Sequence, residues 1–322
     1  MSFQHIDPEY GPGASTEQIP GPGSAADTYL DGVNPFPAIP IPVSPTFGPT
    51  TGESQRPTAD AILFSSDSVM FYVDEYTLLQ FSNNNFRGLL PFLGQDAESR
   101  MLFLHDIHSS ELEIALQALY KIPATIASTA GGGNLEELQL LARGISWLPT
   151  FGIFANVVVL PHTHIFDQIL SYAPLHPLET YAIAGFHDLE QLAVDVSPHT
   201  LPLELSNVTE ELGDQMGWKY MLRLFRLHMN RRTILMNLLA PPPEIHHPTR
   251  DCDYDDQKEL KAKWNMAVGS LTWEIRADTP TSLIREIVEA YTGEITCKKC
   301  IKARDTRLNT ILTEWSMSVR SI

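Results

Sequence analysis

The stretch Ala59–Pro91, ADAILFSSDSVMFYVDEYTLLQFSNNNFRGLLP, is the most informative part of this chain. β-Branched and aromatic residues dominate positions 59–64 and again positions 69–73, and the residues between them, Ser65–Ser68, are polar. Short apolar runs of this kind favour β-strands, and small polar residues favour the tight turn that joins two of them. The two runs therefore predict a β-hairpin.

Helical spacing begins directly after the hairpin. Asp74 can cap a helix by accepting hydrogen bonds from free backbone N–H groups. The apolar residues that follow recur at three- and four-residue intervals until three asparagines interrupt them. The pattern then predicts a second short helix near Phe86–Leu93, a third strand at Met101–Leu104 and a helix at Glu111–Lys121.

This order of elements resembles the opening of the BTB (POZ) domain. The matching residues are Asp60-Ala61-Ile62-Leu63, Phe71-Tyr72-Val73, Leu78-Leu79 to Ser82, and Phe86-Arg87. At Asp74-Glu75 the chain departs from the family, which commonly carries a His-Lys pair there. Further along, Pro177–Ala184 looks like the helical extension of fungal BTB proteins. The resemblance implies an α+β fold, with a BTB-like α/β unit followed by a mostly α-helical extension.

Composition divides the chain into four predicted regions. The first 55 residues hold no Lys or Arg, six acidic residues and ten of the 24 prolines, so residues 1–56 are predicted to be a disordered acidic arm. The BTB-like unit is expected at 57–125 and the helical extension at 126–240, where Trp218–Leu239 is a long candidate helix that ends at three prolines. Residues 241–322 form the C-terminal helical region.

Charge and hydropathy narrow the classes of function. The net charge is −17, and residues 57–257 hold 10 basic and 25 acidic side chains, which makes nucleic-acid binding by this part unfavourable. The chain lacks an apolar run of the roughly 20 residues that a bilayer requires, and its first residues do not read as a secretory signal. We expect an intracellular protein, in the cytoplasm or nucleus, without a membrane span.

The cysteines suggest a metal site. Cys297 and Cys300 have the C-x2-C spacing that lets two thiolates bind one zinc ion, and Cys252 with His246 or His247 can complete a tetrahedral set. The predicted ligands are Cys252, Cys297, Cys300 and His247, with His246 as the alternative histidine. A redox role for the C-x2-C pair is less favoured because no βαβ pattern surrounds it. The predicted cofactor is a structural zinc ion.

The BTB resemblance also implies self-association as a homodimer. Apolar side chains of the first helix and its flanks would form the interface: Tyr76, Leu79, Phe81, Phe86 and Leu90. The alternative is that these side chains are internal core. The resemblance further implies recruitment of clients to a cullin ubiquitin-ligase scaffold or assembly with transcriptional regulators, although no particular residues indicate either partner.

No motif in the sequence proposes a reaction, so the expected class is a non-enzymatic adaptor. Gly144-Ile145-Ser146-Trp147-Leu148 misses the G-x-S-x-G nucleophile elbow because its final glycine is absent. His105, His108, His162 and His164 are expected to be polar surface residues. Two alternatives stay open: a zinc-stabilised monomeric scaffold, and an enzyme with a pocket of converging His, Asp or Glu side chains.

Overall fold

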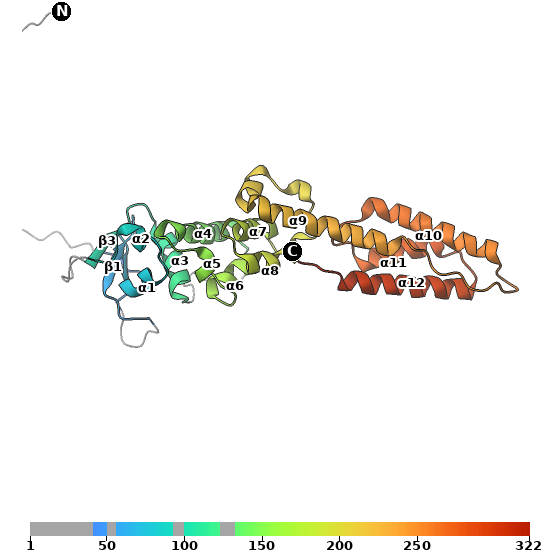
Figure 1. Ribbon diagram of the computed structural model, residues 1–322, viewed down its shortest axis with the longest axis horizontal. Helices are drawn as coiled ribbons and strands as arrows, with labels where there is room; N and C mark the ends of the chain where they lie inside the picture. Colours follow the sequence, from blue (N-terminus) through green and yellow to red (C-terminus); the bar gives the residue numbers. More distant parts are fainter. Residues whose placement is uncertain (1–40, 50–55, 93–99, 123–132) are drawn as a thin grey trace, which may run out of the picture. The chain divides into compact units, whose positions relative to one another are not determined.

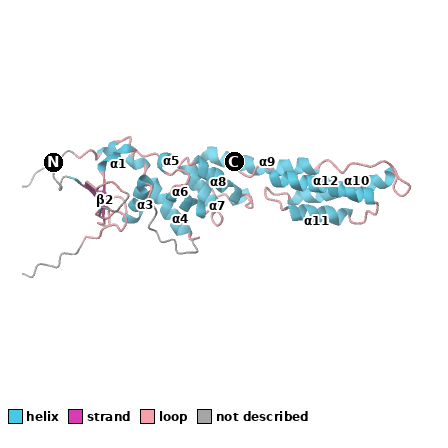
Figure 2. Cartoon of the chain, turned by 90° about the horizontal axis from the view of Figure 1, so that it is seen from below, coloured by secondary structure: helices cyan, strands magenta, loops and turns pink. Residues whose placement is uncertain are grey.

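The computed structural model describes residues 41–49, 56–92, 100–122 and 133–322, and residues 41–322 belong to one compact unit. A small sheet lies in the N-terminal part and helices make up most of the remainder (Figures 1 and 2). Most of the predicted disordered arm, residues 1–40 and 50–55, lies outside the described residues. The architecture is of the α+β class.

The sheet has three strands in the order β2-β1-β3. Strand β1 (Ala61–Phe64) pairs antiparallel with β2 (Met70–Val73), and β3 (Met101–Phe103) pairs parallel with β1. The hairpin predicted from the alternating apolar runs is confirmed. Within the turn, the Ser65 side chain accepts a hydrogen bond from the backbone N–H of Val69 at 3.0 Å, which is the local bonding expected of serine in a turn.

Residues 41–49 were predicted to be part of the disordered arm, and that prediction is wrong for this segment. Val43 forms a parallel bridge with Met70, and the backbone N–H of Ser44 donates to the carbonyl of Met70 at 2.9 Å. Phe47 is fully buried in the apolar core. Prolines are tolerated beside an edge strand because some backbone donors there need no partner, so a proline-rich segment can still dock on β2.

Helix α1 (Glu75–Gln80) begins as predicted at Asp74, whose side chain accepts a hydrogen bond from the backbone N–H of Thr77 at 2.8 Å. The Tyr120 hydroxyl contacts the same carboxylate at 2.9 Å and fixes this corner to α3. The next element, α2 (Asn85–Gly88), is a single turn with positive φ angles at Asn85, Phe86 and Arg87. It turns the Phe86 side chain into the core.

Six helices continue the chain and pack on the sheet unit and on one another. In order they are α3 (Ser109–Tyr120), α4 (Leu135–Ser146), α5 (Ala155–Val158), α6 (His164–Ser171), α7 (Pro177–Phe186) and α8 (Glu190–Thr200), with 3-10 turns at Pro149–Phe151 and Leu205–Asn207. Their buried side chains join those of the sheet in one cluster, so the predicted BTB-like unit and helical extension share a core.

Helix α9 (Glu210–Leu239) contributes to two separate cores. Tyr220 and Leu224 belong to the N-terminal core, whereas Leu235 and Leu239 belong to the C-terminal one. Gly217 interrupts the helix with φ +70°, a value that favours glycine. A Cβ atom at Gly185 would lie 2.6 Å from the carbonyl oxygen of Met216, so a glycine is required where α7 approaches this helix.

The C-terminal core is formed by the end of α9 with α10 (Tyr254–Glu274), α11 (Thr281–Thr292) and α12 (Lys298–Met317). Two indole N–H groups fix its corners: Trp264 donates to the Leu239 carbonyl at 3.0 Å, and Trp315 donates to the Thr279 carbonyl at 2.8 Å. Among the described residues, no helix is long and apolar enough to cross a membrane.

Helix α9 also carries a buried charged residue. Arginine usually lies on the solvent face of a helix, but Arg231 is only 2% exposed. Its guanidinium donates to the carbonyls of Ala277, Ser318 and Val319 and lies over the Trp315 ring at 4.1 Å. A buried guanidinium is tolerated when its donors are hydrogen-bonded, and here backbone carbonyls accept from Nε and Nη1.

Candidate metal centre

The four residues of the candidate centre come from two segments that are far apart in the sequence. His246 and Cys252 lie in the connection between α9 and α10, which the prolines after Leu239 force out of helical conformation. Thr249 and Cys252 form a bridge that folds this connection back, and Asp253 then caps α10. Cys297 precedes α12 and Cys300 lies in its first turn.

The ligand atoms of these residues converge. The Nε2 atom of His246 lies 3.5 Å from the sulphur of Cys252, 3.4 Å from that of Cys297 and 3.3 Å from that of Cys300. The sulphurs of Cys252 and Cys300 are 3.7 Å apart, and all four ligand atoms lie within 4.8 Å of one another. The cysteines are free thiols, so no disulfide accounts for this convergence.

These separations suit a tetrahedral zinc ion. Zn–S bonds of about 2.3 Å and Zn–N bonds of about 2.0 Å, arranged tetrahedrally, place two sulphurs roughly 3.8 Å apart and a sulphur and a nitrogen roughly 3.5 Å apart. Three soft thiolates with one imidazole also favour zinc over the hard cations Mg²⁺ and Ca²⁺, which prefer oxygen ligands. The cluster could therefore hold zinc with four protein ligands.

The electrostatic surroundings differ among the three thiols. The backbone N–H of Cys300 lowers the pKa of the Cys297 thiol to about 6, as expected at the start of a helix. Burial raises the pKa of the Cys300 thiol to about 12, and burial also raises the pKa of Cys252. One ligand is thus prepared as a thiolate, and the buried thiols need a cation nearby to lose their protons.

The structure selects between the two candidate histidines. His246 lies in the cluster, whereas the predicted ligand His247 is exposed and is not part of it. The Nδ1 atom of His246 lies 2.8 Å from the carbonyl oxygen of His247. A proton on Nδ1 can be donated to this carbonyl, which leaves the Nε2 lone pair directed at the sulphurs. His247 therefore contributes a backbone acceptor instead of a ligand.

The residues predicted for self-association do not share one surface. Phe86 and Leu90 are 1% and 3% exposed and belong to the N-terminal core, so these two predictions are wrong for an interface in this conformation. Leu79 and Phe81 are partly buried against the same core. Tyr76 on α1 is 75% exposed. A one-turn element of positive φ directs Phe86 inward, and the sequence pattern assumed a right-handed helix there.

A serine and a histidine meet outside this centre. The Ser146 hydroxyl lies 3.4 Å from Nε2 of His187, but it also lies 2.7 Å from the Ala142 carbonyl, to which it can donate its proton along α4. Burial lowers the pKa of His187 to about 4. Among the described residues, no carboxylate is hydrogen-bonded to this histidine. The pair lacks the orienting group that a nucleophile and base require.

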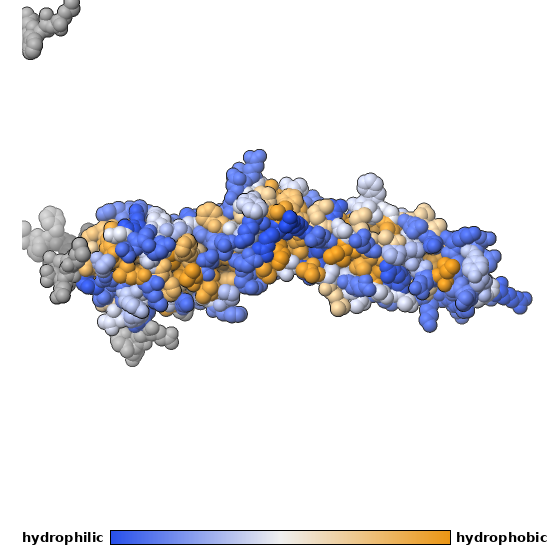
Figure 3. Space-filling model, viewed as in Figure 1, coloured by the Kyte–Doolittle hydropathy of each residue, from blue (hydrophilic) through white to orange (hydrophobic). Residues whose placement is uncertain are grey.

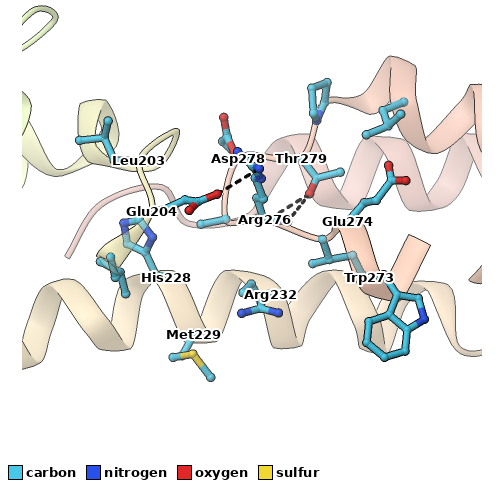
Figure 4. Close-up of a pocket in the computed structure, with 15 residues that line it drawn as sticks. Leu203, Glu204, His228, Met229, Arg232, Trp273, Glu274, Arg276, Asp278 and Thr279 are labelled. Carbon is cyan, nitrogen blue, oxygen red and sulfur yellow. Dashed lines mark hydrogen bonds and ion pairs between the residues drawn. The ribbon is translucent and has the colours of Figure 1, made fainter. Parts of the chain in front are cut away.

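A cavity of about 770 Å³ lies between α9 and the loop after α10 (Figure 4). His228, Glu204 and Asp278 are among its lining residues, which is the composition that the enzyme alternative required. Glu204 forms an ion pair with Arg276 at 3.1 Å, and no described hydrogen bond joins His228 to a carboxylate. The lining groups thus do not form an acid–base pair in this conformation.

Four histidines lie at the surface, as the sequence predicted. His105, His108, His162 and His164 are all exposed, as expected of polar surface residues. The Nδ1 atom of His108 accepts from the backbone N–H of Ser110 and caps α3.

Comparisons of the chain with protein-family models, with curated proteins and with solved structures found no match.

Proposed function

We propose that this chain is a zinc-stabilised protein-interaction scaffold and that His246, Cys252, Cys297 and Cys300 hold a structural zinc ion. The observation that carries the proposal is the convergence of one imidazole nitrogen and three sulphurs within 4.8 Å. Four protein ligands complete the tetrahedral shell, and a closed shell of this kind is characteristic of structural sites, since catalytic zinc keeps a position open for water.

The local packing supports a structural role. Among the described residues, the apolar cluster around the cysteines has three buried members, Cys252, Leu260 and Cys300. So small a cluster provides little hydrophobic stabilisation for the connection between α9 and α10. A bound ion would join this connection to the start of α12, and its binding free energy would contribute directly to folding.

Metal analysis of matched histidine variants tests the proposal. We expect one zinc per chain in the purified protein by native mass spectrometry and a loss of that zinc in His246→Ala. His247→Ala is the matched control, because this neighbouring histidine is exposed and outside the cluster. Equal zinc content in the two variants, or a metal-free wild-type chain that stays metal-free when zinc is supplied, would contradict the proposal.

The cysteines allow an independent test of the same site. Cys300→Ser should lower the zinc content and the melting temperature together. The competing explanation of the cluster is a disulfide between Cys252 and Cys300, which would leave only one free thiol in the unfolded wild-type chain. Titration of thiols in denaturant with a chelator distinguishes these cases. Three reactive thiols are expected, and a count of one would show that oxidation accounts for the cluster.

Self-association is a second candidate function, favoured by the 75% exposure of Tyr76 on a short helix whose other apolar residues pack inward. An exposed tyrosine is a common anchor of protein interfaces. Tyr76→Arg should convert a dimer to a monomer in sedimentation analysis while the helical circular dichroism signal is kept. A wild-type chain that sediments as a monomer at micromolar concentration would contradict this function.

A further inference from the structure

Helix α9 is apolar on two opposite faces. One face is buried in the two cores through Tyr220, Leu224 and Leu235. The opposite face is exposed and carries Trp218 (79% exposed), Leu222 (40%), Phe225 (40%), Met229 (53%) and Met236 (43%), which together we call the α9 outer stripe. The first four members are four, three and four residues apart and form one row along the helix, and Met236 lies on the same face two turns further on.

The charge carried by the α9 segment itself is opposite to that of the chain. Residues 215–243 contain no Asp or Glu, but they contain one Lys and four Arg, in a chain of net charge −17. Lys219 and Arg223 form ion pairs with Asp188 and Glu190 at 2.8 and 2.6 Å. Neither Arg226 nor Arg232, which flank the stripe, forms an ion pair with a described residue. Figure 3 shows hydrophobic and strongly hydrophilic surface side by side over α9.

Met229, in the second half of the stripe, lines the 770 Å³ cavity together with Arg232 and Trp273, which is 92% exposed (Figure 4). Glu204, Glu274 and Asp278 line the same cavity, and Glu204 is paired with Arg276. Methionine and tryptophan side chains are well suited to binding surfaces, because methionine is flexible and tryptophan offers a large apolar area. Exposed large side chains are therefore present both on the stripe and in the cavity beside Met229.

We propose that the α9 outer stripe binds an amphipathic helix of a partner protein, with apolar side chains at three- and four-residue intervals flanked by Asp or Glu. The spacing of the stripe matches the face that such a helix presents. Acidic flanks would complement Arg226 and Arg232. The inference deepens the scaffold function by defining a partner's chemistry, but the surface lies on α9 and uses none of the four zinc ligands.

Charge also separates this partner from a second copy of the chain. In a symmetric dimer through α9, Arg226 and Arg232 of one copy would oppose the same residues of the other, which is unfavourable. Arg226 and Arg232 would also attract an anionic membrane, so binding to vesicles is measured beside binding to peptides.

Selection from a phage-displayed library of amphipathic helices, with all flanking positions randomised, tests the proposal on the zinc-loaded full chain. The library is first depleted on the double variant Phe225→Ser/Met229→Ser, so that only ligands of the stripe remain. We expect the selected flanks to be enriched in Asp and Glu. The selected peptide should bind the double variant and Arg226→Glu/Arg232→Glu at least roughly tenfold more weakly than wild type, about 1.4 kcal/mol.

Met266→Ser on α10, whose side chain is 60% exposed, is the matched control and should leave affinity unchanged. Circular dichroism and zinc content, measured on every variant, separate loss of the surface from loss of the fold or metal. The inference is overturned if the library yields no enriched peptide, if the selected flanks are basic, or if the double variant binds the selected peptide as tightly as wild type does. It is also overturned if the chain forms a dimer that Phe225→Ser dissociates, or if the stripe binds phosphatidylserine vesicles but no peptide.

Discussion

The two cores of this protein are stabilised by different means. The N-terminal core gathers 42 buried apolar residues from the sheet and from helices as far as α9, whereas the C-terminal core has eleven among the described residues. The smaller core is supplemented by directed contacts: two indole N–H bonds, the buried Arg231 and the His/Cys cluster. A region that buries little apolar surface needs such fixed contacts to reach a stable fold.

Metal removal should show the largest difference between the two cores. On addition of a chelator, we expect hydrogen exchange in α10 and the start of α12 to accelerate by on the order of 100-fold or more, because zinc binding is coupled to folding. Exchange in β1, β2 and α3 should change little, because the metal does not contact their core. Exchange mass spectrometry measures both regions in one sample, and uniform acceleration would show that the two cores do not differ in metal dependence.

Arg231→Met should give the next largest effect, a loss of free energy of unfolding in the C-terminal core. Methionine keeps the apolar part of the side chain but leaves the carbonyls of Ala277, Ser318 and Val319 without their donor, at a cost of about 3 kcal/mol. Arg232→Met is the control, since Arg232 is exposed and should cost no more than about 0.5 kcal/mol. Urea denaturation of the zinc-loaded protein provides the comparison. Equal losses would mean that burial of Arg231 does not matter for stability.

Acid should weaken the N-terminal core through His187. Burial lowers the pKa of this histidine from 6.5 to about 4, so between these values the unfolded chain binds a proton that the folded chain does not. The contribution of His187 to the free energy of unfolding is fully present above pH 6.5 and falls as the pH approaches 4. At pH 4.5 about 2.5 kcal/mol of it is lost. His187→Asn should reduce this loss. Denaturation at pH 7.5 and 4.5 tests it, and an identical loss in the variant would assign the acid sensitivity to other groups.

Local patterns predicted the elements of the sheet unit. Asp74 begins α1, the runs at 59–64 and 69–73 form the hairpin, and the helix predicted at Glu111–Lys121 corresponds to α3. Each of these depends on residues adjacent in the sequence, whose propensities and side-chain capping act within a few positions. The C-x2-C pair was informative for the same reason, because its spacing alone places two sulphurs on one helical turn.

Features set by distant contacts were missed. The docking of Phe47 depends on β2, and the burial of Phe86 depends on a turn of positive φ that no periodicity signals. Arg231 differs from its neighbour Arg232 only in the face of α9 that it occupies. The choice of His246 over His247 required the fold of the connection after the prolines. Tertiary packing determines the environment of such residues, and local propensity does not predict it.

Helix α9 belongs to both cores, and this sharing links the proposed zinc site to the proposed partner surface. Leu235 and Leu239 hold its last turns in the C-terminal core, and Met229 and Met236 lie on the same half of the helix. A partner that requires this half to stay helical would bind the zinc-free chain more weakly. By thermodynamic reciprocity, the bound partner would then slow or reduce the release of zinc by the same free energy.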